Sequence, residues 1–199
     1  MKLSKSLFAA AALLAASGAF AQAVGSAGGL TNSANFLDLS TATVSGGATY
    51  FANALPNAAI PFNTVGPITT VGAWLAAGPG NNGDATLTLP GGTTYVSFLW
   101  GSPDPIGWNT LTVNTDTGSS VFTASGLGIL PTPNGDQQFA SYVNFTPTGS
   151  ATKITSLTFG ANQNAFEISN VTAVPEPETY ALMLAGLAAV GFFVRRRSA

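Results

Sequence analysis

Apolar and polar residues alternate in short runs through most of the chain between residues 36 and 173. The clearest runs are TLTL at residues 86–89 and TLTV at 110–113, which place Leu or Val on one side and Thr on the other. A period of two is the pattern of β-strands with one buried face. We predict strands over residues 49–52, 68–75, 85–89, 95–100, 109–113, 121–125, 141–145, 154–159 and 166–171.

Clusters of Gly, Pro, Asn and Asp separate the predicted strands, and these residue types favour turns. Short strands joined by such turns, with no helix-period segment among them, predict an all-β fold. We expect an antiparallel β-sandwich, jelly-roll or Ig-like, over residues 36–173. In its last strand, Phe166 and Ile168 are predicted to be buried and Glu167 to face solvent. Residues 22–35 are small and polar, which predicts a flexible leader.

The N-terminal segment has the order of a secretory signal peptide. Two lysines precede the apolar run 7–16, and small residues with Ala19 and Ala21 at the cleavage positions follow it. The run is too short to span a bilayer as a helix. We therefore predict that residues 1–21 are removed by the secretion machinery, with the cut before Gln22 or two residues later.

The C-terminal segment has the order of a membrane anchor. An uncharged apolar run at 180–194 is followed directly by Arg195, Arg196 and Arg197. As a helix, the run is about 22 Å long, short of a hydrocarbon core of roughly 30 Å, so arginines that snorkel would complete a marginal span. The positive-inside rule places the arginines in the cytoplasm and the rest of the chain outside. We predict one transmembrane helix over residues 180–194.

A proline-rich stretch, VPEPE, stands just before this run and contains Pro175, Glu176 and Pro177. Two prolines in three residues exclude a continuous helix and predict an extended, solvated segment. The order of extended motif, short apolar helix and arginine cluster over residues 174–199 resembles the PEP-CTERM sorting signal of exosortase substrates.

That resemblance implies a partner and a route. A transpeptidase-like membrane enzyme, an exosortase, is expected to recognise Pro175, Glu176 and Pro177 and to cleave near them. The β domain would first be held at the inner membrane, outside the cytoplasm, and then be released or transferred to the cell surface or the extracellular space.

Composition narrows the chemistry of the β domain. Between residues 22 and 173 the sequence has no His, Cys or Arg and a single Lys, Lys153. This excludes Ser-His-Asp, Cys-His and zinc-His sites, and it disfavours nucleic acid as a partner because phosphate binding needs clustered cations. Carboxylate chemistry remains open, but five of the six acids lie in or beside turn-like segments: Asp38, Asp84, Asp104, Asp116 and Asp136.

Candidate ligand contacts are few. Trp108 follows Gly107 in a predicted loop and is the aromatic residue best placed to contact a ligand. Aromatic residues are more often part of a core, and Trp100 alternates with Phe98 as the interior of a strand does. Loops rich in Asn, Asp and Gly offer oxygen ligands for Ca²⁺ without EF-hand spacing, and a plain solvated turn is the simpler interpretation. These loops are residues 80–84, 114–118 and 134–136.

We therefore predict a non-enzymatic envelope or matrix protein without a cofactor. Two alternatives stay open: a carbohydrate-binding module for exopolysaccharide, and a glycoside hydrolase that uses carboxylates alone.

Overall fold

The computed structural model describes residues 21–51, 66–67, 69–104, 107–129, 139–149, 152–176 and 185–188. Within these residues the chain forms two antiparallel β-sheets and one 3-10 turn, η1 (Ser33–Asn35), between the first two strands. The predicted all-β class is confirmed. Residues 1–20, including Ala19, lie outside the described part, as do Pro177, the arginines 195–197 and the candidate loop at 134–136.

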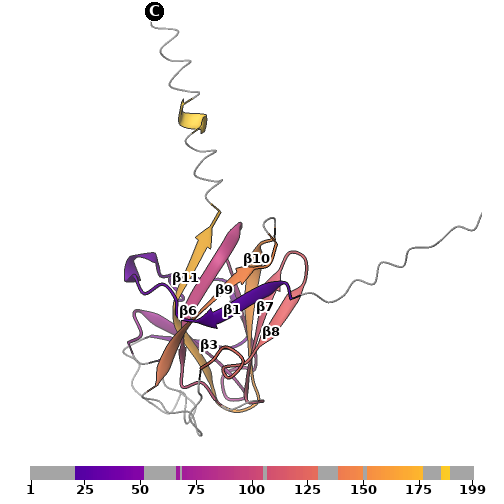
Figure 1. The fold of residues 1–199 in the computed structure, drawn as a ribbon. Helices are drawn as coiled ribbons and strands as arrows, with labels where there is room; N and C mark the ends of the chain where they lie inside the picture. Colours follow the sequence, from indigo (N-terminus) through magenta and orange to yellow (C-terminus); the bar gives the residue numbers. More distant parts are fainter. Residues whose placement is uncertain are drawn as a thin grey trace, which may run out of the picture.

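The first sheet has six strands in the order β1-β9-β6-β11-β4-β3. Their bounds are β1 Ala23–Ala27, β9 Ala140–Pro147, β6 Thr93–Gly101, β11 Phe166–Pro175, β4 Ala73–Ala77 and β3 Ala48–Phe51. The second sheet has five strands in the order β2-β5-β10-β7-β8. Their bounds are β2 Val44–Ser45, β5 Ala85–Thr88, β10 Ile154–Ala161, β7 Asn109–Thr115 and β8 Ser119–Phe122. Figure 1 shows β1 beside β9, and β11 reaching one end of the domain.

From β4 onward, consecutive strands pass from one sheet to the other, apart from the β7–β8 hairpin. The two sheets face each other across one apolar core to which both contribute. At its centre Phe159 of β10 packs edge-on against Phe166 of β11, with ring centroids 5.2 Å apart. Trp100 of β6 stacks on the same Phe166 at 4.3 Å. Aromatic pairs of this kind contribute about 0.5–1.5 kcal/mol each beyond the area they bury.

The predicted alternation is confirmed at the inward positions. Leu87, Leu111 and Val113 are fully buried, and so are Phe166 and Ile168. All nine predicted strands overlap an observed strand, although most of their bounds differ by one or more residues, and two predicted segments extend well beyond the strand that forms. The segment predicted at 68–75 becomes a strand only from residue 73, because Thr69 and Gly72 adopt positive φ angles that interrupt an extended chain. The segment predicted at 121–125 ends at 122, where a tight turn begins.

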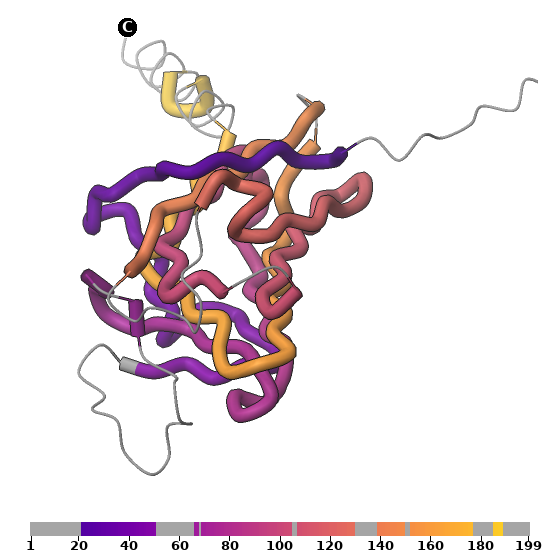
Figure 2. Tube along the Cα trace, turned by 60° about the horizontal axis from the view of Figure 1, so that its bottom comes forward, coloured from indigo at the N-terminus to yellow at the C-terminus, as the bar shows by residue number. Residues whose placement is uncertain are grey.

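The prediction of a flexible leader over residues 22–35 was wrong. Residues 23–27 form β1, which pairs with β9 along its whole length, from Ala23 opposite Pro147 to Ala27 opposite Val143. Figure 2 shows this N-terminal segment lying across the domain beside β9. A strand at a sheet edge is held by backbone hydrogen bonds, so it forms without an alternating side-chain pattern. Gly25 sits where the Phe145 ring leaves no room for a side chain.

Glu167 was predicted to face solvent, and it is fully buried. The alternation itself is correct, because Phe166 and Ile168 on either side of it belong to the core between the sheets. The other face of β11 is covered too: Pro67 lies against Gly101, the residue that pairs with Glu167. Inside this cover, the Ser102 hydroxyl donates a hydrogen bond of 2.9 Å to the Glu167 carboxylate.

The β domain extends beyond the predicted bounds of 36 and 173. It includes β1 at the start, and at the end β11 continues to Pro175. Of the predicted transmembrane segment 180–194, the structure describes residues 185–188, which are helical. In the described part of the chain, no helix has the length and apolar character needed to cross a membrane. The transmembrane span therefore stays a prediction from the sequence.

Candidate functional site

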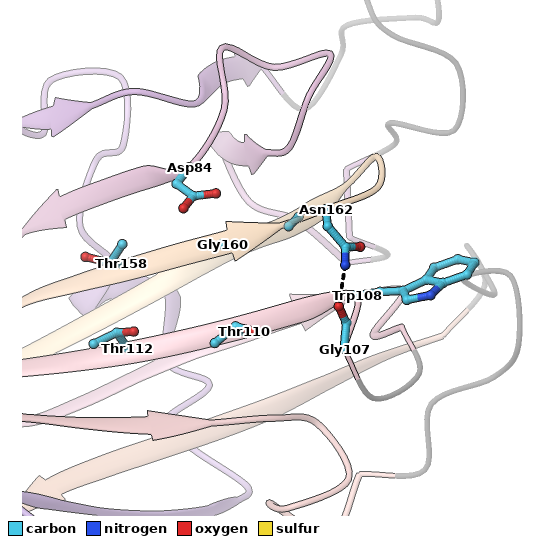
Figure 3. Close-up of a pocket in the computed structure, with 9 residues that line it drawn as sticks. Asp84, Gly107, Trp108, Thr110, Thr112, Thr158, Gly160 and Asn162 are labelled. Atoms are coloured by element: carbon cyan, nitrogen blue, oxygen red, sulfur yellow. Dashed lines mark hydrogen bonds between the residues drawn. The ribbon is translucent and has the colours of Figure 1, made fainter.

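A groove of about 310 Å³ runs over the outer face of the five-stranded sheet. Its floor comes from two neighbouring strands: Thr112 of β7 lies opposite Thr158 of β10, and Thr110 lies opposite Gly160. Asp84 stands over the β10 side, and the Trp108 indole lies at one end of the groove (Figure 3). The outward threonines of the alternating strands are therefore the residues that build the site.

Two local features shape this groove. Gly160 leaves its floor open, because a Cβ atom there would lie 3.4 Å from the Asp84 carboxylate. The turn that carries Trp108 is tied to β10 by Asn162, whose backbone N–H donates to the Trp108 carbonyl at 3.1 Å. The Asn162 side-chain amide also donates to the Gly107 carbonyl at 2.6 Å (Figure 3). Trp108, with 37% of its surface exposed, is thus held at a defined place on the surface.

The polar lining is linked by hydrogen bonds along the sheet. Thr86 and Thr158 share a hydrogen bond of 3.0 Å between their hydroxyls. The Asn114 amide donates to Ser156 and to Thr158, at 3.1 Å in both cases. Among the described lining residues one carboxylate and no cation is present. An exposed indole beside ordered hydroxyl and amide groups is suited to bind a polyhydroxyl molecule by stacking and hydrogen bonding.

The structure places the other two tryptophans in the interior, and for Trp100 the sequence predicted this position. Trp100 is fully buried in the main core, and Trp74 packs against Tyr50 with ring centroids 4.6 Å apart. Trp108 is therefore the one of the three tryptophans that is available to a ligand at the groove. The position of Asp84 and the threonines beside it was missed from sequence, because nothing in the pattern says which strands of a sandwich become neighbours.

The loops considered for calcium are closed by their own hydrogen bonds. In the first, Gly78 and Gly83 exchange two backbone hydrogen bonds, and Asn81 is buried and accepts from the Tyr50 hydroxyl at 2.8 Å. In the second, Thr115 donates from its hydroxyl to the Gly118 carbonyl at 2.9 Å. Within the described ranges no three acidic, His or Cys side chains gather in a group suited to a metal ion.

The acids divide between the groove and the interior. Asp104 is 6% exposed, and burial raises its pKa to about 6, while the Asn109 side chain opposes this shift. Glu167 is buried in contact with Ser102. Neither lies among the described residues that line the groove, where Asp84 is the carboxylate. A carboxylate-only glycosidase needs two acids on either side of a substrate, so the groove offers half of that arrangement.

The sorting motif lies at the end of β11. Val174 pairs with Tyr95 and Pro175 with Thr93, with a register shift between Val174 and Pro175. Such an irregularity suits proline, which has no N–H to donate to the ladder. Glu176 continues the contact, since its N–H donates to the Gly92 carbonyl at 2.9 Å. Pro175 is extended, as predicted, and both Pro175 and Glu176 are half-buried rather than fully solvated.

The fold and the sequence of the C-terminal segment together indicate the class of protein. A β-sandwich-like domain runs without a break from its last strand into a proline-glutamate motif, an apolar segment and an arginine cluster. This is the arrangement of an exported domain with a C-terminal sorting tail.

The comparison with known families identifies this tail. Residues 173–197 match the family described as the PEP-CTERM protein-sorting motif, so the resemblance seen in the sequence is confirmed. The match begins inside β11 and supports an exported protein that an exosortase sorts. None of the curated proteins compared with the chain matches it, and none of the solved structures does.

Proposed function

We propose that this protein is a non-enzymatic component of the cell envelope or extracellular matrix, delivered there by exosortase-dependent processing of its tail. The observation that carries the proposal is the PEP-CTERM match over residues 173–197. The ordered n-, h- and c-regions of the signal peptide support export, and the arginines 195–197 support an orientation with the β domain outside. The tail then acts as a transient anchor in the inner membrane.

The side chains that the sequence supplies support a role without catalysis. Between residues 22 and 173 there is no His or Cys to act as base or nucleophile. The groove residues are hydroxyls, an amide, an indole and the carboxylate of Asp84. These groups hydrogen-bond and stack, which is the chemistry of binding.

Replacement of Pro175, Glu176 and Pro177 together by Ala tests the sorting role. Export should remain intact, and the uncleaved protein should accumulate in the inner membrane. Deletion of residues 180–199 is the matched variant: without the apolar run, the domain should be released without being processed. Mass spectrometry of the C-terminus of the wild-type protein at its final location distinguishes a transient from a permanent anchor. Protein that still carries residues 195–197 at that location would be permanently anchored.

A second candidate, a carbohydrate-binding module for exopolysaccharide, is favoured by the groove at Trp108. The strand order supports it at the level of fold: β4, β11, β6 and β9 in one sheet and β5, β10, β7 and β8 in the other follow the order of a jelly roll. Jelly rolls include lectin domains, but that is an analogy of fold and carries no site. The site argument rests on Trp108, Asp84 and the threonine floor.

The charge of the groove restricts the class of polysaccharide that it would bind. Asp84 is its carboxylate, and no cation is found among its described lining residues. Uronate-rich or sulfated polysaccharides would be repelled there, so we expect neutral or amino-substituted sugars to bind. Trp108→Ala should weaken binding of a neutral polysaccharide about tenfold, and Trp108→Phe should weaken it less because a ring is retained.

Val121→Ala is the matched control, because Val121 is an exposed apolar residue of β8 in the same sheet, 63% exposed. It should leave binding unchanged. Isothermal titration with neutral and acidic polysaccharides makes the comparison. Equal binding by the wild type and Trp108→Ala would exclude this groove as the glycan site.

A further inference from the structure

The sorting motif is bound by the domain that it serves. The Lys153 ammonium forms an ion pair with the Glu176 carboxylate, and the Glu176 N–H donates to the Gly92 carbonyl. The two paired side chains are 22% and 20% exposed. The carboxylate and the backbone N–H of Glu176, two groups by which a partner could recognise this residue, are therefore engaged within the domain.

The position of Lys153 is set by its neighbours. Its backbone N–H donates to the Asp116 carboxylate at 3.1 Å, and its carbonyl accepts from the Asp116 N–H at 3.1 Å. The next residue, Ile154, is buried and begins β10. The backbone of Lys153 is thus already fixed, so pairing with Glu176 requires ordering of the lysine side chain but not of its backbone. Partial burial also reduces the screening of the pair by salt.

The sequence makes this pairing specific. Lys153 is the only Lys or Arg between residues 6 and 194. No other cation in the segment between β9 and β10 competes with Lys153 for Glu176. Its partner, Glu176, is the glutamate of the sorting motif. A solvated lysine at a random surface position would contact no part of the motif.

We propose that Lys153 is a positioning residue for the sorting reaction: it holds Glu176 against the edge of the folded domain and so limits access of the membrane enzyme to the motif. This rests on the proposed function, in which that enzyme reads Glu176. Recognition requires the Lys153–Glu176 pair and the Glu176–Gly92 hydrogen bond to open, while the core of β11 stays in place. The rate of processing then follows the fraction of molecules in which the end of β11 is open.

Replacement of Lys153 tests this latch on the full chain. Lys153→Met removes the charge and keeps most of the apolar stem, so the opening equilibrium constant at Glu176 should rise about fivefold. Lys153→Arg keeps the charge and should stay within about twofold of the wild type. Lys153→Glu places a second carboxylate beside that of Glu176. The repulsion should open the end of β11 further than Lys153→Met does.

The first readout is hydrogen exchange at the Glu176 amide of the exported, tail-bearing protein in detergent micelles. Exchange should be slow in the wild type and in Lys153→Arg, and faster in Lys153→Met. Thermal unfolding shows whether each variant keeps its fold. Equal exchange at Glu176 in folded wild type and folded Lys153→Met would overturn the latch.

The second readout is pulse-chase conversion of the tailed to the processed form in cells. Processing should be faster in Lys153→Met than in the wild type and unchanged in Lys153→Arg. Faster amide exchange with an unchanged processing rate would overturn the gating role while leaving sorting intact. If the wild type is never processed, the proposed function fails, and the exchange readout still reports whether Lys153 holds Glu176.

Discussion

Ser102 and Glu167 meet inside the protein: the serine hydroxyl donates a hydrogen bond of 2.9 Å to a glutamate that has no exposed surface. The serine lies just past the end of β6, with a φ of 35°, and the glutamate is the second residue of β11. A hydrogen bond to a buried carboxyl group matters because that group has lost its hydrogen bonds to water. The pair therefore joins two neighbouring strands at the covered face of the six-stranded sheet.

Removal of this donor should destabilise the domain. Ser102→Ala keeps the Cβ atom, so the backbone strain at the positive φ is unchanged and the loss of the hydroxyl is isolated. We expect the free energy of unfolding to fall by about 1.5–3 kcal/mol. Urea denaturation measures it. In a Glu167→Met background the same change should cost less, because the acceptor is absent, and equal costs in both backgrounds would contradict a hydrogen bond between the two side chains.

Substitution at Gly25 tests whether residues 23–27 pack on the domain as a strand or form a flexible leader. A Cβ atom at Gly25 would lie 2.4 Å from a carbon of the Phe145 ring and 2.9 Å from Leu127. Gly25→Ala should therefore cost about 1–3 kcal/mol in the free energy of unfolding. Gly91→Ala is the control, since nothing lies within 4 Å of a Cβ atom there. If both variants are as stable as the wild type, β1 does not pack against β9 as described.

Asp104 should make stability depend on pH. Burial raises its pKa from 3.8 to about 6, so the folded chain binds this proton more tightly than the unfolded chain. The resulting stabilisation is complete below about pH 4 and is lost as the pH rises through 6, a change of up to about 3 kcal/mol. Asp104→Asn should remove this part of the pH dependence, as measured by urea denaturation from pH 4 to 7.

Asp38→Asn is the matched control, because Asp38 changes the stability with pH in the opposite direction from Asp104. Hydrogen bonds from Ser40, its side chain first and then its backbone, lower the pKa of Asp38. That contribution is present at neutral pH and is lost as the pH falls through the lowered pKa. A wild-type protein and an Asp104→Asn variant whose stabilities differ by a constant amount from pH 4 to 7 would show that Asp104 does not titrate in this range.

Truncation at Phe166 should remove the centre of the core. Its ring stacks on Trp100 at 4.3 Å with an interplanar angle of 14°, and it meets Phe159 edge-on. Phe166→Ala should lower the free energy of unfolding by about 3–5 kcal/mol. The exposed Val121→Ala should change it by less than about 0.5 kcal/mol. Tryptophan fluorescence of the folded variant should shift as well, because Trp100 loses its stacked neighbour.

The mature N-terminus should be Gln22. Its backbone N–H and that of Ala23 both donate to the Ser120 hydroxyl, at 2.8 and 3.0 Å, and its side chain accepts from Thr117 at 2.7 Å. A cut before Val24 would remove these contacts. Terminal sequencing of the released protein checks the prediction, and Met1 on that protein would contradict export through a cleaved signal peptide.

The alternation of residues was sufficient to predict which side chains of a strand share a face. Leu87, Leu111 and Val113 were predicted to lie inward and are buried, because the side-chain period of a strand is local geometry. The tail was equally clear, since the PEP-CTERM motif is a linear pattern over residues 173–197.

What the alternation could not predict is which faces and edges become covered, because that depends on neighbours far along the chain. The pattern correctly placed Glu167 on the opposite face from Phe166, but whether that face meets water was decided by the segment around Pro67, about a hundred residues earlier. The same holds for β1, whose edge is defined by β9. Long-range pairing leaves no trace in a single sequence, because backbone hydrogen bonds do not depend on side-chain type.

The sequence by itself determined an exported, all-β chain with a sorting tail, since hydrophobic period, turn residues and terminal motifs act over short distances. Only the tertiary structure decided that Asp84, Trp108 and three threonines from two strands line one groove. It also decided that the single lysine of the domain pairs with the glutamate of its own sorting motif. Both arrangements depend on which strands become neighbours, and that is settled when the two sheets close over a common core.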